Sequence, residues 1–306
     1  MEFCVGGSVS DFAKTWCKED KDGVLDPQSD RFDYFDIMSL NPLKVSALCV
    51  GMIECLDDVF LVKKGIVHRD IKPENFLVRV DPKDGECTII LGDLGLTEIL
   101  DSRSSSTSKI LVSSKKVKKT EHERSICGTL IYNSYETLKY CVQDQRSDGY
   151  SLGLSILAMF FGENPLSRNP YLRGKDPNSF EFLSSLIDLL SHDIVPPINI
   201  SPLFESLLSV EDGKYESVYY CLDEVFKGLT QIDRKDRMGV HDARLRVQGI
   251  KSLLPTIGSG WKYPSIEDII SKHKVTRRKS PYIRKTHVDD GVQDFSNSQS
   301  TSYLSK

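Results

Sequence analysis

Four polar side chains in two short segments have the chemistry that a phosphoryl transfer requires. Residues 68–75 read HRDIKPEN, and the letters DLG begin at Asp93, eighteen residues after Asn75. The reaction needs a carboxylate that accepts the proton of the attacking hydroxyl, a cation beside the phosphate and oxygen ligands for Mg²⁺. We expect Asp70 to be the base, Lys72 the cation, and Asn75 and Asp93 the Mg²⁺ ligands.

The two expected metal ligands are separated by a predicted β-hairpin. Residues 76–80 and 87–91 are rich in β-forming side chains, and they flank the turn-forming letters DPKDG. Because paired strands return the chain to its starting edge, the hairpin would bring Asp93 back to Asn75.

Helices must support this hairpin and the loop before it. Asn41-Pro42 is a helix start signal, and the apolar residues that follow recur every three or four positions, which predicts a deeply buried helix over 42–63. Residues 150–161 are apolar on nearly every side, which predicts a helix that is buried all round.

Shorter amphipathic segments complete the predicted fold. Helical apolar spacing predicts helices over 179–190 and 217–229, and Ser8 or Ser10 could cap a short helix near the start of the chain. The predicted fold class is therefore mainly α with one small β-hairpin.

The segments HRDIKPEN and DLG resemble the catalytic loop HRDxKxxN and the metal loop DFG of the eukaryotic protein kinase superfamily. The lysine two residues after the aspartate resembles the serine/threonine branch. The resemblance implies a kinase C-terminal lobe that transfers phosphoryl from ATP, with Mg²⁺, to Ser or Thr of a protein substrate. A chance capped turn is the alternative, and a match of eight residues followed by D-x-G at the expected distance argues against it.

Other segments resemble further kinase motifs in the same order. The letters GTLIYNSYE, which begin at Gly128, resemble GTxxYxAPE with Ser-Tyr in place of Ala-Pro. The resemblance implies that Thr129 hydrogen-bonds to Asp70 and Lys72. It also implies that Glu136 forms a buried ion pair with Arg237, which stands where the family has the arginine of DPxxR.

The letters DGYSLG, which begin at Asp148, resemble DxWSxG with Tyr in place of Trp. The resemblance implies that Asp148 accepts hydrogen bonds from the turn that contains His68 and Arg69. It also suggests that Arg69 pairs with a phosphate on Thr120 or Ser125. A solvated insertion that carries no phosphate is the alternative.

The first seven letters, MEFCVGG, resemble the hinge that precedes the kinase C-lobe. By this resemblance Glu2 and Cys4 would offer backbone groups to adenine, and Leu77 would lie under the ring. The sequence contains no GxGxxG loop and no VAIK-like strand lysine, so we expect the N-terminal β-rich lobe to be absent and this chain alone to be inactive.

Three interpretations of this pattern stay open. The chain is a truncated form of a longer active kinase, a non-catalytic kinase-like binding or scaffold module, or a lobe that receives its missing half or its activation from a partner protein. The intact catalytic and metal-loop motifs favour the first interpretation, because docking alone needs neither a base nor Mg²⁺ ligands.

Charge is unevenly distributed along the chain. The sequence has 40 Lys and Arg against 44 Asp and Glu, a formal charge of −4, which excludes a globally basic nucleic-acid-binding protein. Segments 102–125 and 277–306 are basic. We expect residues 1–12 to be a hinge-like segment, 13–276 a C-lobe with a Ser/Lys-rich activation-segment insertion at 102–125, and 277–306 a disordered tail.

Composition also bears on partners and location. No apolar run is long enough to cross a bilayer, no secretory signal is visible, and the eight Cys show no CxxC pair. We expect reduced thiols, no membrane partner, and a cytoplasmic or nuclear location. The basic runs lack the interleaved aromatic residues that nucleic-acid stacking requires; they are import signals, docks for an acidic partner or solvated faces.

Overall fold

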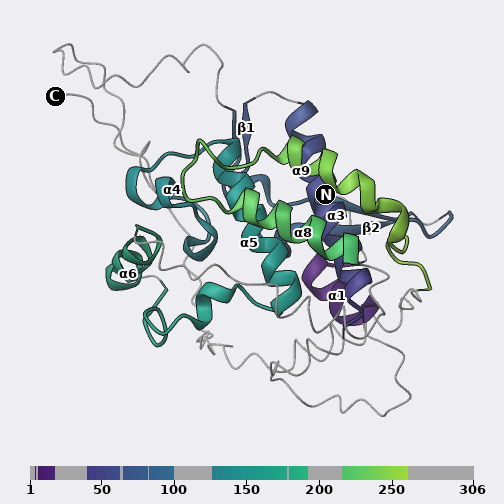
Figure 1. Cartoon of the computed structure of the whole chain (residues 1–306), viewed down its shortest axis with the longest axis horizontal. Coiled ribbons are helices and arrows are strands. Elements are labelled where there is room, and N and C mark those ends of the chain that lie inside the picture. The colour runs from purple at the N-terminus through teal and green to yellow at the C-terminus, as the bar shows by residue number, and fades with distance from the viewer. Residues whose placement is uncertain are drawn as a thin grey trace, which may run out of the picture. The chain divides into compact units, whose positions relative to one another are not determined.

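The computed structural model describes residues 4, 6–17, 40–62, 65–81, 83–99, 126–177, 179–191 and 216–260 (Figure 1). All of them belong to the first of two units of the chain, Met1–Gly260. Helices dominate this part, and its strands form two small sheets. The α-helices are α1 (Val9–Trp16), α3 (Pro42–Val62), α4 (Tyr135–Tyr140), α5 (Gln145–Phe161), α6 (Phe180–Ser191), α8 (Glu216–Leu229) and α9 (Val240–Val247). The 3₁₀ turns are η1 (Pro73–Asn75), η2 (Leu94–Leu96), η4 (Leu130–Tyr132), η5 (Pro165–Arg168) and η6 (Gln248–Leu253).

Helix α3 is one of the two central helices, and it confirms the prediction over 42–63 to within one residue. The side chain of Asn41 accepts hydrogen bonds from the backbone N–H groups of Leu43 (3.0 Å) and Lys44 (3.1 Å). Pro42 occupies the first helical position, where its missing N–H is not needed. Most of the helix is buried, which explains why its apolar residues cover more than one face.

Helix α5 is the second central helix, and it is buried on all sides from Ser147 to Phe160, as predicted. It starts five residues before the predicted Tyr150. Asp144 caps it in a reciprocal capping box with Ser147. The first turn is polar, so the apolar pattern that gave the prediction begins only at the second turn.

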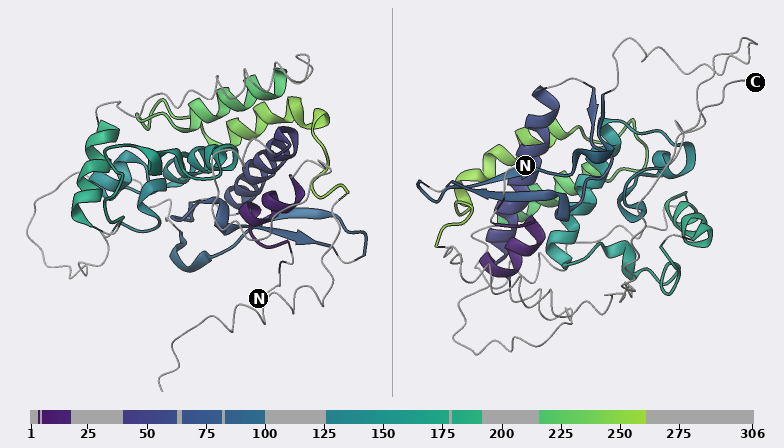
Figure 2. Two further views of the ribbon diagram at one scale, coloured as in Figure 1. Left: turned by 90° about the horizontal axis from the view of Figure 1, so that it is seen from below. Right: turned by 180° about the vertical axis from the view of Figure 1, so that it is seen from behind.

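The remaining helices pack around this pair. Helix α9 contacts α3, and α8 contacts both α5 and α9; Figure 2 (left) shows α8 and α9, in green, along one side of the two central helices. The predicted helices over 179–190 and 217–229 are confirmed as α6 and α8. Ser8 caps α1, accepting a hydrogen bond from the Asp11 N–H.

A buried carboxylate also links α3 to α9. Asp57 is 2% exposed. Its Oδ2 accepts a hydrogen bond from Nη1 of Arg244 (3.2 Å) and lies 3.1 Å from Nδ1 of His241. Because a buried charge is tolerated only with partners, this cluster specifies how the two helices meet.

The predicted hairpin is confirmed at the predicted residues. Strands β2 (Phe76–Val80) and β3 (Cys87–Leu91) pair antiparallel, with Phe76 opposite Leu91 and Val80 opposite Cys87. The expectation of a single hairpin was incomplete, because β1 (Ile66–Val67) also pairs with β4 (Glu98–Ile99). Two-residue strands have too little pattern to be recognised in a sequence.

Several predictions concern residues that the structure does not describe. These are the hinge residue Glu2, the insertion at 102–125 and the tail at 277–306, so the proposed domain boundaries stay predictions. Among the described helices, none is long and apolar enough to cross a membrane. The eight cysteines all lie in described positions, and none of them forms a disulfide.

Candidate active site

The segment that resembles the kinase catalytic loop, residues 68–75, lies between β1 and β2 and ends in η1. Its first two backbone N–H groups, of His68 and Arg69, donate to the two carboxylate oxygens of Asp148 on α5, at 2.6 and 2.9 Å. Asp148 is only 2% exposed, so the loop is anchored to the most buried helix of the fold. These are the hydrogen bonds that the resemblance implied for Asp148.

Burial raises the pKa of Asp148 to about 7, against the effect of the two backbone donors and of the Arg69 charge. The hydrogen bonds that the native turn supplies therefore offset only part of the cost of burying this charge. The anchor and the turn consequently stabilise each other.

Asp70 lies at the centre of a network of donors from three residues in two segments. Its Oδ1 accepts the backbone N–H (2.9 Å) and the hydroxyl (2.8 Å) of Thr129. Its Oδ2 accepts Nδ2 of Asn75 (2.9 Å) and lies 2.9 Å from Nζ of Lys72. Lys72 also donates to the Thr129 hydroxyl at 2.8 Å. The structure thus brings together the residues that the sequence singled out, although their chemical roles stay predictions.

The surroundings of Asp70 favour its ionised form. Burial acts to raise the pKa of this carboxyl, but the hydrogen bonds from Lys72, Thr129 and Asn75 outweigh it and lower the pKa below its usual value. An ionised carboxylate at neutral pH is the state that can accept a proton from a hydroxyl.

Asn75 and Asp93 lie at the same end of the β2–β3 hairpin. The backbone N–H of Gly92 donates to the carbonyl of Asn75 at 2.8 Å, which places Asp93 one residue beyond the point of pairing. Asp93 adopts a left-handed backbone conformation (φ 51°), and its Oδ1 accepts only a long 3.4 Å bond from Gly95. The exposed carboxylate of Asp93 is therefore not committed to a strong internal partner.

This donor set fits Mg²⁺. The amide nitrogen of Asn75 donates to Asp70, which leaves the amide oxygen for a cation, and Asp93 offers a carboxylate. No group of three or more His, Cys, Asp or Glu that could hold a metal is found in the described part of the chain. Mg²⁺ does not need one, because it commonly takes one or two protein oxygens together with phosphate oxygens and water.

His68 is buried behind the catalytic loop. It is 1% exposed, and its Nε2 lies 2.9 Å from the carbonyl oxygen of Gly92, so it joins the loop to the segment that carries Asp93. Its Nδ1 is buried without a hydrogen-bond partner. Burial lowers the pKa of His68, against the Gly92 carbonyl and the charges of Asp70 and Asp93. A neutral ring that donates from Nε2 is the form that fits this environment.

Gly128 lets the segment from Asp93 to Glu136, which corresponds to the kinase activation segment, reach the catalytic loop. Its backbone has φ +83°, and a Cβ at this position would lie 2.1 Å from the carbonyl oxygen of Arg69. A side chain here would displace the segment, and Thr129 could no longer donate to Asp70. Glycine is required at this position by both conformation and space.

Arg69 has a partner that the sequence analysis did not foresee. Its Nη2 forms an ion pair with the carboxylate of Glu98 on β4. The predicted phosphate acceptors, Thr120 and Ser125, lie outside the described residues. A glutamate in a two-residue strand carries no recognisable signal, so only the structure could identify it.

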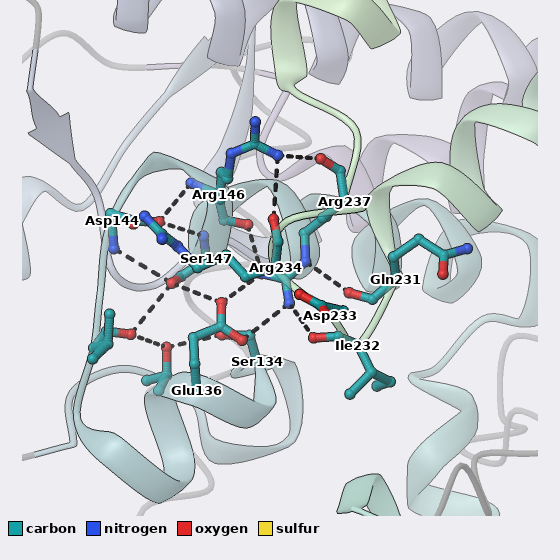
Figure 3. A network of polar contacts seen from close by, with 12 residues as sticks. Ser134, Glu136, Asp144, Arg146, Ser147, Gln231, Ile232, Asp233, Arg234 and Arg237 are labelled. Carbon is teal, nitrogen blue, oxygen red and sulfur yellow. Dashed lines mark hydrogen bonds and ion pairs between the residues drawn. The ribbon is translucent and has the colours of Figure 1, made fainter.

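Glu136 and Arg237 form the predicted buried ion pair (Figure 3). Nη1 and Nη2 of Arg237 lie 2.5 and 3.0 Å from the two oxygens of Glu136, and the Arg237 side chain is 0% exposed. Arg237 also donates to the carbonyls of Gln231, Ile232 and Arg146. The guanidinium is thus satisfied on every side, as a buried charge must be.

The capping box of α5 joins this network. The hydroxyl of Ser147 donates to Glu136 at 3.3 Å, and Arg234 forms an ion pair with Asp144 (Figure 3). Tyr150, which stands where the family has Trp, is 1% exposed, and its ring lies 5.0 Å from the Arg237 guanidinium. An aromatic ring at this position is therefore part of the arginine site. The motif D-x-x-S before an apolar run could have identified Asp144 and Ser147.

The expected nucleotide-binding residues are only partly described. Glu2 lies outside the described residues. The Cys4 carbonyl accepts the Gly7 N–H at 3.1 Å, and the Gly7 carbonyl accepts the N–H of Val78 on β2 at 2.9 Å. Leu77 is half-buried on β2, and Ser8 forms an isolated β-bridge with it, so the described part of the hinge-like segment lies along β2. Their contact with adenine stays a prediction.

The chain matches the family model of the protein kinase domain over residues 1–244, and it therefore belongs to this family. It is 32% identical to "Serine/threonine-protein kinase A" of Synechocystis sp. (strain ATCC 27184 / PCC 6803 / Kazusa) over 141 residues, which are 43% of this chain and 24% of that protein. It is 34% identical to "Serine/threonine-protein kinase PKH2" of Saccharomyces cerevisiae (strain ATCC 204508 / S288c) over 122 residues, 40% of this chain and 10% of that protein.

A third relative is "Aurora kinase" of Dictyostelium discoideum, which is 30% identical over 146 residues, 48% of this chain and 29% of the relative. The matches thus span less than a third of the length of each of these three proteins. Membership of the protein kinase family and similarity to serine/threonine kinases are established on this basis.

Proposed function

We propose that the chain provides the catalytic loop of a serine/threonine protein kinase, which transfers the γ-phosphoryl group of ATP to a serine or threonine hydroxyl of a protein. The observation that supports this most directly is the network around Asp70. An ionised carboxylate is held by Lys72, Asn75 and Thr129, and the hairpin returns the chain to Asn75 one residue before Asp93. A docking surface needs no such concentration of charge.

Each side chain has a distinct role in the proposed reaction. Asp70 orients the substrate hydroxyl and accepts its proton as the new O–P bond forms and the bond to the leaving ADP oxygen breaks. Lys72 lies beside Asp70 and neutralises charge on the transferring phosphate. ATP supplies the phosphoryl group and Mg²⁺ neutralises its oxygens; Asn75 and Asp93 would hold that ion. Thr129 positions Asp70 and Lys72 relative to each other.

We further propose that transfer requires groups that the 306 residues do not contain. The sequence has neither a GxGxxG phosphate loop nor a VAIK-like strand lysine. Removal of one preorganised electrostatic group typically lowers the rate by about 10²–10³-fold, so the loss of two should leave little turnover. We therefore expect Mg²⁺–ATP to produce no measurable thermal shift of the purified chain; a saturable shift would contradict this part of the proposal.

A chimera tests the chemical part. The small lobe of an active serine/threonine kinase is fused before residue 1, and phosphate transfer from ATP to Ser, Thr and Tyr versions of one peptide is measured. We expect transfer to Ser or Thr, and a loss of at least about 10³-fold for Asp70→Asn. The matched control is Asp81→Asn, which alters an exposed aspartate in the hairpin turn.

The outcomes separate the interpretations. A folded chimera with bound ATP but no transfer would support a non-catalytic binding module. Transfer that Asp70→Asn leaves unchanged would contradict the assignment of the base. Transfer by the 306 residues alone would contradict only the requirement for added groups.

A further inference from the structure

The strongest unassigned feature of the site is the ion pair between Arg69 and Glu98. Arg69 immediately precedes Asp70 and has a left-handed backbone conformation with φ 72°, which is unusual for a residue other than glycine. Its N–H donates to Asp148 at 2.9 Å, while its side chain extends to β4 and pairs there with Glu98. One residue thus connects the buried helix, the catalytic loop and the strand beyond the metal loop.

The backbone places Glu98 at this position independently of the ion pair. In the β1–β4 sheet Glu98 lies opposite Val67, two residues before Arg69. The strand follows η2, which itself follows Asp93, and the N–H of Thr97 donates to the carbonyl of Leu94 at 3.1 Å. The pairing of Glu98 therefore holds the start of the activation segment against the catalytic loop.

The charge of Arg69 makes a partner necessary. An arginine remains protonated in proteins, and this side chain is only 22% exposed, with Nε buried and unpaired. In kinases a phosphate added to the activation segment commonly orders that segment by pairing with arginine. In this chain the anion near Arg69 is a carboxylate that the sequence itself encodes.

We infer that Glu98 is a built-in anionic partner of Arg69, so that the activation segment docks on the catalytic loop without phosphorylation. The Gly128–Thr129 turn already lies against Arg69 and Asp70 in the unmodified chain. A phosphate on the segment would then compete with Glu98 for one guanidinium instead of filling a vacant site. The inference rests on the proposed function only for its consequence, a kinase whose activity does not depend on this phosphate.

The test measures amide hydrogen exchange in the full chain after phosphatase treatment, and it requires no catalysis. In the wild-type chain we expect slow exchange of the Thr129 amide and of the amides in β1. Glu98→Gln should speed exchange at these amides by about three- to tenfold, because Arg69 loses its partner. The matched control is Glu86→Gln, which alters an exposed glutamate in the β2–β3 turn. It should leave the exchange of the Thr129 amide and of the β1 amides unchanged.

Anion rescue distinguishes charge neutralisation from simple packing. Inorganic phosphate at millimolar concentration should restore slow exchange in Glu98→Gln, because it can pair with the vacated Arg69, and it should leave the wild type unchanged. Equal exchange in Glu98→Gln and wild type would overturn the inference. So would a wild-type chain whose Thr129 amide is protected only when the segment is phosphorylated.

These results are independent of the kinase assay. If the chimera fails to transfer phosphate while Glu98→Gln loosens the segment and phosphate restores it, the proposed function fails and the docking inference stands. If the chimera is active and the amides of Glu98→Gln exchange like those of the wild type, the docking inference fails and the proposed function stands.

Discussion

The carboxylate of Asp70 is held by hydrogen-bond donors from its own loop and from a residue that is distant in sequence. Thr129 lies 59 residues away, yet its N–H and hydroxyl both donate to Oδ1. Together with Lys72 and Asn75 they lower the carboxyl pKa in spite of burial. This carboxyl group is therefore ionised well before neutral pH is reached.

His68 leads to a prediction about pH at the same scale. Its native pKa lies below the usual value of about 6.5 because the ring is buried. The unfolded chain therefore takes up a proton near pH 6.5 that the native chain does not bind. Stability contributed by His68 is present above pH 6.5 and is lost as the pH falls toward the native pKa.

We expect His68→Gln to remove this dependence. Between pH 7.5 and 5.5 the wild type should lose about 1 kcal/mol more unfolding free energy than the variant, as measured by urea denaturation at each pH. Titrating groups that both chains contain, Asp148 among them, contribute equally to the two pH profiles and cancel when one profile is subtracted from the other. Parallel pH profiles would contradict the assignment of a neutral, buried ring.

The activation segment shows how two elements approach each other through one position. Gly128 brings the segment against the Arg69 carbonyl, and a Cβ would clash there. We expect Gly128→Ala to lower the unfolding free energy by about 1–3 kcal/mol and to speed exchange of the Thr129 amide.

Gly174→Ala is the matched control for this variant. Gly174 has φ +81°, close to that of Gly128, but a Cβ there would meet no atom within 4 Å. The control should carry only the backbone strain, about 1 kcal/mol, and leave Thr129 exchange unchanged. Equal effects of the two variants on Thr129 would show that the close approach is unimportant.

The ion pair between Glu136 and Arg237 joins α4 to the segment between α8 and α9. Since Arg237 is fully buried, Glu136→Gln leaves a charge without its counterion, and we expect a loss of about 3–5 kcal/mol in urea unfolding. Glu224→Gln, which removes an exposed partner of Arg246, should cost less than about 1 kcal/mol.

A second substitution tests the cause of that loss. In the double variant Glu136→Gln, Arg237→Met both charges are absent, and part of the lost stability should return. A double variant that is less stable than Glu136→Gln would indicate that the arginine stabilises the fold chiefly through its three backbone carbonyl contacts.

At the scale of the whole unit, the fold extends past the residues matched by the family model. After residue 244 the chain completes α9, forms η6 and continues to Gly260 along α1, α3 and β3. Nε1 of Trp16 donates to the carbonyl of Ser259 at 3.0 Å, and Lys251 pairs with Glu54 of α3 at 2.7 Å. This extension closes the helical unit over its N-terminal helix.

Gly258 packs closely against Cys87 of β3. A Cβ there would lie 2.3 Å from Sγ of Cys87, and the backbone has φ +80°. Gly260 has φ +73°, with nothing within 4 Å of a Cβ. We expect Gly258→Ala to lower the unfolding free energy by about 1–3 kcal/mol more than Gly260→Ala. Equal urea midpoints would show that the extension does not pack tightly on β3.

Much of this fold was predictable from local pattern. The apolar spacing of α3 and α5 and the β-forming letters of the hairpin located the elements that hold Asp70, Asn75 and Asp93. Helix α9 was missed because its sequence, VHDARLRV, has polar and charged side chains between its few apolar ones. Helix α4 was missed because its six residues are too few for a periodic signal.

Residue type and order along the chain determined the class of protein and its candidate catalytic residues, because a base, a cation and oxygen ligands at short spacing can be identified without coordinates. Only the tertiary structure decided what surrounds them. The pairing of Arg69 with Glu98 and the packing of residues 248–260 against α1, α3 and β3 join segments far apart in sequence. Such contacts depend on packing and on space at single positions such as Gly128, and no local pattern encodes them.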